Sequence, residues 1–194
     1  LKGKVKQFFV PLGVGSHLKK WGIEDSRIKE LNWWDSIHLN NVEFVCTPAQ
    51  HFSGRGLTNG GSTLWSSWVI KSDSTNVFFS GDSGYSTHFK AIGDKYGPFD
   101  MALMECGQYN ELWSEIHMMP EETAQAAQDV KANKMIPIHW GAFKLALHDW
   151  RDPIRRVTKR ADELNVKVIS PKIGEMVDVH KVEPKDMEWW QNVE

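Results

Sequence analysis

Three short motifs, each directly after an apolar run, decide the fold of this chain: Thr47-Pro48-Ala49-Gln50-His51, Ser80-Gly81-Asp82-Ser83-Gly84-Tyr85 and Ile136-Pro137-Ile138-His139-Trp140-Gly141. The apolar runs are typical of buried strands, so each motif begins where a strand ends. Imidazoles and carboxylates are the ligands of hydrolytic metal sites, and we expect His51, Asp82 and His139 to share one. Such a site needs more than three ligands, and the remaining sequence supplies no obvious others.

Helical and strand patterns alternate on either side of these motifs. The patterns predict strands over residues 5–11, 42–47, 63–71, 76–80, 99–105, 134–138, 166–169 and 175–179. They predict helices over 16–21, 26–31, 86–96, 120–133 and 152–165. Two long loops, 51–62 and 107–119, interrupt the pattern, and loops of this length in compact domains are usually functional. Alternating helices and strands predict an α/β layered fold.

Composition excludes several classes of function. The net charge is −2 with mixed signs and no basic stripe, so nucleic acid is not an expected partner. No apolar run approaches the roughly 20 residues that span a bilayer. Two distant cysteines make no disulfide framework, which favours a reducing, cytoplasmic location.

The chain holds ten tryptophans, including the doublets Trp33-Trp34 and Trp189-Trp190. Exposed aromatic side chains can sit at a membrane interface, which raises peripheral membrane contact as one hypothesis. The alternative is that these rings pack in the core or against a partner.

Further polar residues lie outside the three motifs. His117, just before the helix start at Pro120, could act as a general acid or base or hold a substrate oxygen. The alternative is a hydrogen bond that only fixes the loop. His148 and Asp149 lie in a turn and favour a structural interpretation. Ser83 lacks the strand–elbow–helix spacing of a serine hydrolase, so we reject that reading.

With these residues placed, the chain resembles the metallo-β-lactamase-fold hydrolases. It is most similar to the branch that holds the N-acyl-phosphatidylethanolamine-hydrolysing phospholipases D, with the ascorbate-phosphate lactonases as cousins. The resemblance rests on four motifs in order: Thr-Pro-Ala-Gln-His at 47–51, Gly-Asp-Ser-Gly-Tyr at 81–85, His-Met-Met-Pro-Glu-Glu at 117–122 and Ile-His-Trp-Gly at 138–141. It extends over about residues 5–179.

The resemblance implies a role for each matched residue. His51 would ligate one of two divalent metal ions, His139 the other, and Asp82 would bridge both; zinc, manganese and iron all suit such ligands. His117 and Asp82 would take part in catalysis. The implied fold is a four-layer αββα sandwich with the metals at one edge of its two sheets.

One family signature is missing. No His-x-His-x-Asp-His cluster occurs in this chain. We therefore expect residues 1–194 to form an incomplete single domain: the C-terminal half and part of the first half's sheet. The first half would be removed, on a separate chain, or lost from a degenerate protein.

Two functions follow as hypotheses. The first is a metal-dependent hydrolase of a phosphodiester, phospholipid or lactone, inactive as residues 1–194 alone and working with the N-terminal half as partner. The second is a non-catalytic half-domain that needs that partner to form a site. An oligomer is compatible with either.

Overall fold

The computed structural model describes residues 2–54, 60–143, 145–181 and 188–193. Its main element is a seven-stranded sheet in the order β3-β4-β5-β6-β7-β8-β9. Its strands are β3 Ser36–Leu39, β4 Val42–Thr47, β5 Ser67–Lys71, β6 Asn76–Phe79, β7 Met101–Glu105, β8 Lys134–Ile138 and β9 Lys167–Val168. Strands β3 to β6 pair antiparallel and β6 to β9 pair parallel. The predicted α/β class is confirmed.

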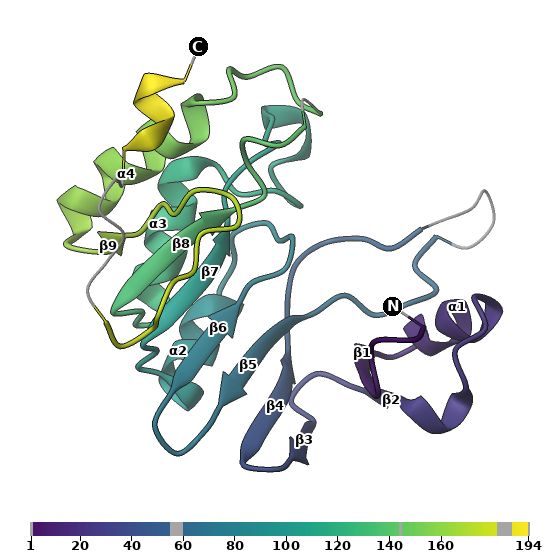
Figure 1. Ribbon diagram of the computed structural model, residues 1–194. Helices are drawn as coiled ribbons and strands as arrows, with labels where there is room; N and C mark the ends of the chain where they lie inside the picture. Colours follow the sequence, from purple (N-terminus) through teal and green to yellow (C-terminus); the bar gives the residue numbers. More distant parts are fainter. Residues whose placement is uncertain (1, 55–59, 144, 182–187, 194) are drawn as a thin grey trace.

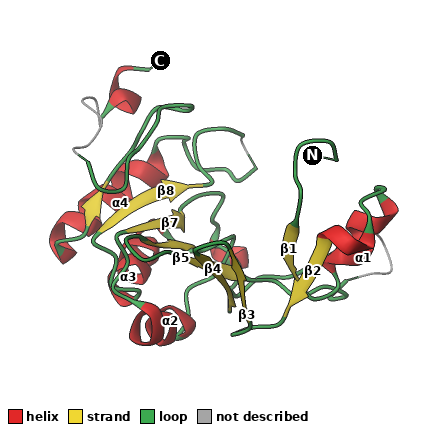
Figure 2. Ribbon diagram, turned by 60° about the horizontal axis from the view of Figure 1, so that its bottom comes forward, coloured by secondary structure: helices red, strands yellow, loops and turns green. Residues whose placement is uncertain are grey.

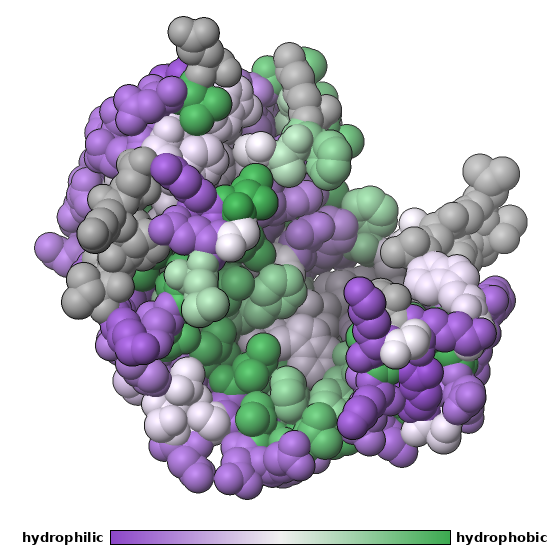
Figure 3. Space-filling view, in the orientation of Figure 1, coloured by the Kyte–Doolittle hydropathy of each residue, from purple (hydrophilic) through white to green (hydrophobic). Residues whose placement is uncertain are grey.

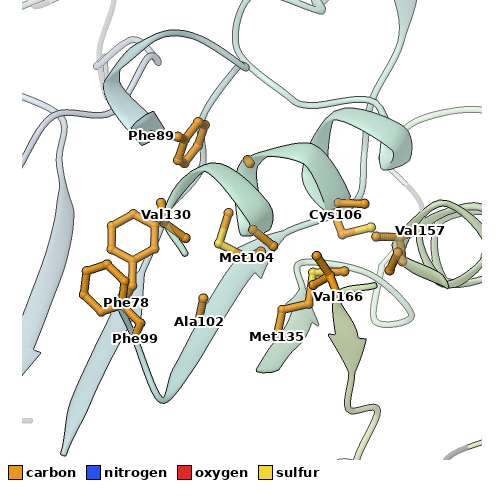
Figure 4. Close-up of a cluster of buried hydrophobic side chains, with 14 of the residues drawn as sticks. Phe78, Phe89, Phe99, Ala102, Met104, Cys106, Val130, Met135, Val157 and Val166 are labelled. Carbon is orange, nitrogen blue, oxygen red and sulfur yellow. The ribbon is translucent and has the colours of Figure 1, made fainter. Parts of the chain in front are cut away.

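Three helices cover one face of this sheet. They are α2 His88–Tyr96, α3 Pro120–Asp129 and α4 Asp152–Leu164, and each connects two parallel strands. Parallel crossovers are right-handed, which puts consecutive connecting helices on the same side, as Figures 1 and 2 show. Figure 4 shows the core between them, where Phe78, Met104 and Met135 of the strands meet Phe89 and Val157 of the helices.

The other face of the sheet is apolar but not fully buried. Side chains alternate between the faces of a strand, and Val45, Val69 and Phe78 point into the core. Their neighbours Phe44 and Ile70 are only half-buried. Figure 3, in the orientation of Figure 1, shows hydrophobic residues gathered over this part of the molecule. The described residues therefore form one layer of sheet covered on one face by one layer of helices.

A small unit precedes the sheet. Strands β1 Phe8–Pro11 and β2 Ile28–Leu31 pair parallel, connected through helix α1 Val14–Lys20. The helix predicted over 26–31 is wrong. Residues 25–27 form one 3₁₀ turn, and the short stretch after it gains more hydrogen bonds by pairing with β1 than an isolated helical turn supplies.

Other sequence predictions also need correction. The strand predicted over 175–179 is wrong, because Lys172 and Glu175 exchange hydrogen bonds in a turn. Strand β3 was not predicted; its four residues are mostly exposed at the sheet edge, and their alternation of polar and apolar side chains is too short to predict a strand. Helix α1 begins at Val14 and not at Ser16, since Gly13 at φ +86° is its N-cap. Residues 55–59 of the predicted loop lie outside the described residues.

The cysteines and many aromatic rings are packed inside. Cys46 and Cys106 are free and fully buried, and burial raises the pKa of Cys46 to about 11, which makes its thiol unreactive. Trp190 is buried, and Trp189 stacks on Trp140 with ring centroids 6.0 Å apart. Among the described residues, no helix combines the length and apolar character needed to cross a bilayer.

His88, at the start of α2, gives a prediction about pH. Burial lowers its pKa from 6.5 to about 4, so the unfolded chain binds the proton more readily between these values. The depressed pKa means that stability is complete above about pH 6.5 and is lost as the pH falls toward 4. Between about pH 7.5 and 5, urea titration should show a loss of about 2 kcal/mol from this group. In His88→Gln the loss of stability between the two pH values should shrink by about 2 kcal/mol. Replacing the exposed His38 by Gln should leave that loss unchanged. Equal losses in the wild type and both variants would contradict the role of His88 in this pH dependence.

Candidate metal centre

The topology brings the sequence motifs to one edge of the sheet. Strand β5 runs antiparallel to both β4 and β6, so those two point the same way, and β7 and β8 are parallel to β6. The carboxyl ends of β4, β6, β7 and β8 therefore share one edge. His51, Asp82, His117 and His139 follow these four strands in turn.

Gln50 ties three of the loops together. Its backbone N–H donates to Ser83 Oγ at 2.9 Å, and its carbonyl accepts from Gly84 N–H at 2.8 Å. Its side-chain amide donates to the carbonyl of Glu115 at 2.8 Å. These bonds hold the loop of His51 against the loops of Asp82 and His117. Sequence reasoning missed this role of Gln50, because a hydrogen bond across 65 residues leaves no local signal.

Two glycines let the loops approach closely. A Cβ on Gly84 would lie 2.1 Å from the carbonyl oxygen of Glu115. A Cβ on Gly107 would lie 2.3 Å from the carbonyl oxygen of His139. His139 itself has φ +67°, a left-handed conformation that costs energy for a residue with a side chain. Close backbone packing therefore places both the His117 loop and His139.

The four candidate side chains converge. The rings of His51 and His117 have centroids 5.2 Å apart, and those of His117 and His139 are 5.4 Å apart. His139 Nε2 lies 3.8 Å from Asp82 Oδ2, which is too long for a hydrogen bond. His117 thus lies between the other two imidazoles, and Asp82 lies beside His139.

His51 has a free nitrogen in a suitable state for a metal. Its Nδ1 lies 2.8 Å from the carbonyl oxygen of Phe52, an acceptor, so Nδ1 carries the proton. Nε2 then presents a lone pair, and this atom is buried without a hydrogen-bond partner among the described residues. A metal-ligating histidine is typically held by such a bond from its other nitrogen. The chemistry of this nitrogen therefore fits a metal ion, and Asp82 and His139 are the other ligands that the sequence predicts.

The described side chains do not form a complete site by themselves. Within the described part of the chain, no three histidine, cysteine or acidic side chains are placed to hold one metal ion together. What the structure brings together is two imidazoles and a carboxylate, with a third imidazole between them.

A buried carboxylate supports His117. Glu105 Oε1 lies 3.0 Å from His117 Nδ1, and Glu105 is fully buried. Burial raises the pKa of Glu105, while its hydrogen bond to His117 acts in the opposite direction. The sequence prediction missed Glu105, although an acid that ends the apolar run 99–105 was a visible signal.

The remaining candidates have structural roles. His148 Nε2 accepts from the backbone N–H of Gln108 at 3.0 Å, and its ring stacks on Tyr109 with centroids 4.3 Å apart. Ser83 is buried, and its hydroxyl accepts from Gln50 N–H and donates to the carbonyl of Gly84. A hydroxyl bound in this way is not an exposed nucleophile, which agrees with the sequence interpretation.

A cavity lies beside the metal-site edge. Its volume is about 530 Å³ and its lining is mainly apolar and aromatic, including Phe143, Trp150 and Trp189. Gly141, two residues after His139, is part of its lining, and Gln108, His148 and Asp149 are the polar residues there. A ligand with a large apolar part would fit this lining.

Comparison with known proteins identifies the family. Residues 1–140 match the β-lactamase superfamily domain. An uncharacterized protein of Mycobacterium tuberculosis is 44% identical over 174 residues, which cover 88% of this chain and 46% of that protein. An N-acyl-phosphatidylethanolamine-hydrolyzing phospholipase D of Caenorhabditis elegans is 31% identical over 185 residues, covering 88% of this chain and 52% of that protein. The chain spans about half the length of these curated relatives.

A solved structure agrees with the same fold. The metallo hydrolase Igni18 of the archaeon Ignicoccus hospitalis superposes with a TM-score of 0.67 over 88% of this chain and 67% of that one. Its sequence identity is 22%, so this similarity speaks for the fold alone.

Proposed function

The chain belongs to the metallo-β-lactamase superfamily of hydrolases, and from this we propose that it forms the C-terminal part of a two-metal hydrolytic centre. In this proposal His51 holds one divalent ion, His139 holds the other and Asp82 bridges them. The observation that carries the proposal is the buried, unpaired Nε2 of His51 beside the cluster of His117, His139 and Asp82. Zinc, manganese and iron are the candidate metals.

A bound pair of metal ions would supply a water of lowered pKa and polarise the bond to be cleaved. The residues of this chain would bind the metal ions and position the substrate. Asp82 would contribute a negatively charged ligand, and His51 and His139 would contribute nitrogen ligands. His117, next to both imidazoles, is placed to hold a substrate oxygen or to transfer a proton to the leaving group.

We propose that the substrate is a phosphodiester or a lactone with an apolar part, and that a phospholipid is one such molecule. The name of the C. elegans relative and the mainly apolar cavity that Gly141 lines both support this class. A peripheral contact with a lipid surface would follow if the substrate is a membrane lipid. Trp21 and Trp34 are tryptophans that the fold leaves exposed.

We further propose that an upstream segment completes the site. The open sheet face carries half-buried Phe44, Ile70, Ile136 and Ile138, and Phe79 is 37% exposed. An apolar sheet face is stable when another layer covers it. The relatives are about twice as long as this chain, so their additional length is enough to form such a layer. That segment would also supply the metal ligands that the described residues lack.

The alternative function is a half-domain without catalysis of its own. It is favoured by one observation: within the described residues, no three potential ligands hold an ion together. The two proposals differ in what an added upstream segment does.

The test uses the full-length protein and residues 1–194 side by side. We expect the full-length protein to bind metal and to hydrolyse an activated phosphodiester or a lactone. Chelation should lower this activity at least about 100-fold, with recovery on adding one of the three metals. Residues 1–194 should be inactive alone and gain at least about tenfold when the upstream segment is added. Full activity after complete removal of metal would refute the hydrolase proposal, and no gain on complementation would favour the half-domain.

A further inference from the structure

Glu105 is a charged side chain that the proposed reaction does not yet use. It ends strand β7, where its neighbours Met101, Ala102 and Met104 are all buried and apolar. Glu105 is itself fully buried. Burying a carboxylate costs several kcal/mol unless hydrogen bonds replace the lost water. An apolar residue would fill the same space at no such cost, so the acid calls for a specific reason.

Three N–H groups surround the two carboxylate oxygens. Oε1 lies 3.0 Å from His117 Nδ1 and 3.3 Å from the backbone nitrogen of Gly107. Oε2 accepts from the backbone N–H of Met118 at 3.1 Å. An ionised carboxylate offers acceptors only, so with Glu105 ionised this arrangement places a proton on His117 Nδ1.

The consequence for His117 is a fixed tautomer and a fixed ring plane. With Nδ1–H directed to Glu105, the neutral ring keeps its lone pair on Nε2. The same ring lies 5.2 Å from the ring of His51 and 5.4 Å from that of His139, between the proposed metal ligands. Glu105 also holds the backbone at Met118, directly after His117, so side chain and backbone are restrained from one point.

We propose that Glu105 is the positioning residue of the site: it binds the Nδ1 proton of His117 and so keeps Nε2 available toward the space between His51, Asp82 and His139. This inference rests on the proposed hydrolytic function for its catalytic consequence. Its structural content, the tautomer of His117, stands independently of any activity.

Glutamine at position 105 tests the proposal with almost no change in volume. An amide has one oxygen and one NH₂ group, so it cannot accept from His117, Gly107 and Met118 together. If its NH₂ group faces His117, Nδ1 must become the acceptor and the proton moves to Nε2. If the NH₂ group of the new glutamine faces Met118, it meets the backbone N–H of Met118, and because two donors repel each other the loop shifts. Either outcome disturbs His117.

Thr123→Val is the matched control. The Thr123 hydroxyl is buried and donates to the backbone carbonyl of Glu105 at 2.9 Å. Its loss weakens the same strand end but leaves the carboxylate in place. A merely structural role for Glu105 predicts that the two variants behave alike.

The first measurement is ¹⁵N NMR of histidine-labelled, metal-free full-length protein at about pH 8, where an imidazole is mainly neutral. His117 is assigned by its absence from His117→Gln. We expect a protonated Nδ1 and an unprotonated Nε2 in the wild type and in Thr123→Val. In Glu105→Gln we expect a reversed or mixed tautomer, or shifted His117 resonances from the displaced loop. An unchanged His117 signal in Glu105→Gln would overturn the proposal.

The second measurement separates this proposal from the proposed function. In the metal-loaded protein, kcat should fall about 10- to 100-fold in Glu105→Gln with KM within about threefold, and change little in Thr123→Val. If no variant or wild type shows activity, the proposed function fails while the NMR result still decides the role of Glu105. An unchanged kcat in Glu105→Gln, with an active wild type, would contradict the positioning role.

Discussion

Replacing Asp82 by Asn in the full-length protein is expected to lower kcat/KM by at least about 1000-fold and to reduce the bound metal. Asp82 follows strand β6, and its Oδ2 lies 3.8 Å from Nε2 of His139. An amide has nearly the same shape but no charge, so it is a poor bridge between two cations. His139→Ala should act in the same direction through loss of one ligand.

The measurement pairs metal analysis with steady-state kinetics. Circular dichroism should report an unchanged fold, because Asp82 is 47% exposed in its side chain and supports no buried network. Asp162→Asn, on the exposed surface of α4, is the matched change of charge and should keep both metal and activity. If Asp82→Asn retained its metal and at least about a third of its activity, the assignment of Asp82 as a metal ligand would be wrong.

Gly84→Ala should be one of the most damaging single methyl additions. The new Cβ would lie 2.1 Å from the carbonyl oxygen and 2.4 Å from the carbonyl carbon of Glu115. Backbone atoms cannot give way as the end of a side chain can, so the loop that carries His117 must move. We expect a loss of about 3 kcal/mol of stability and at least about 100-fold in activity.

Urea titration measures the loss of stability, and the same hydrolase assay measures the loss of activity. Gly60→Ala is the control, since a Cβ there would meet no atom of the described residues within 4 Å. It should change stability by less than about 0.5 kcal/mol. Equal behaviour of the two alanine variants would mean that the loops of Asp82 and His117 do not pack as closely as described.

The sequence predicted the elements that carry a strong local pattern. Strands β4, β6 and β8 lie within a residue of their predicted bounds, because each is an apolar run closed by a turn motif. Predictions failed where the local pattern was weak. Residues 28–31 carry only two buried side chains, and their conformation depends on pairing with residues 8–11.

For the candidate site too, the sequence predicted some residues and missed others. His51, Asp82 and His139 were found because each ends a recognisable apolar run, and the family resemblance rests on these motifs. Glu105 and Gln50 were not found. The acid that ends the apolar run 99–105 marked Glu105 as unusual, but its partner His117 lies 12 residues away, and the partner of Gln50 lies 65 residues away, so neither pairing is visible in the local pattern.

The sequence by itself determined the α/β class and the family, since these follow from local apolar patterns and from motif order, and it singled out His51, Asp82 and His139 as candidate metal ligands. Only the tertiary structure decided that His51, Asp82, His117 and His139 share one edge, because that depends on the relative direction of β4, β6, β7 and β8. It also decided which nitrogen of His117 is held by Glu105, because that contact joins the end of β7 to the segment just before α3, at the two ends of the loop between them.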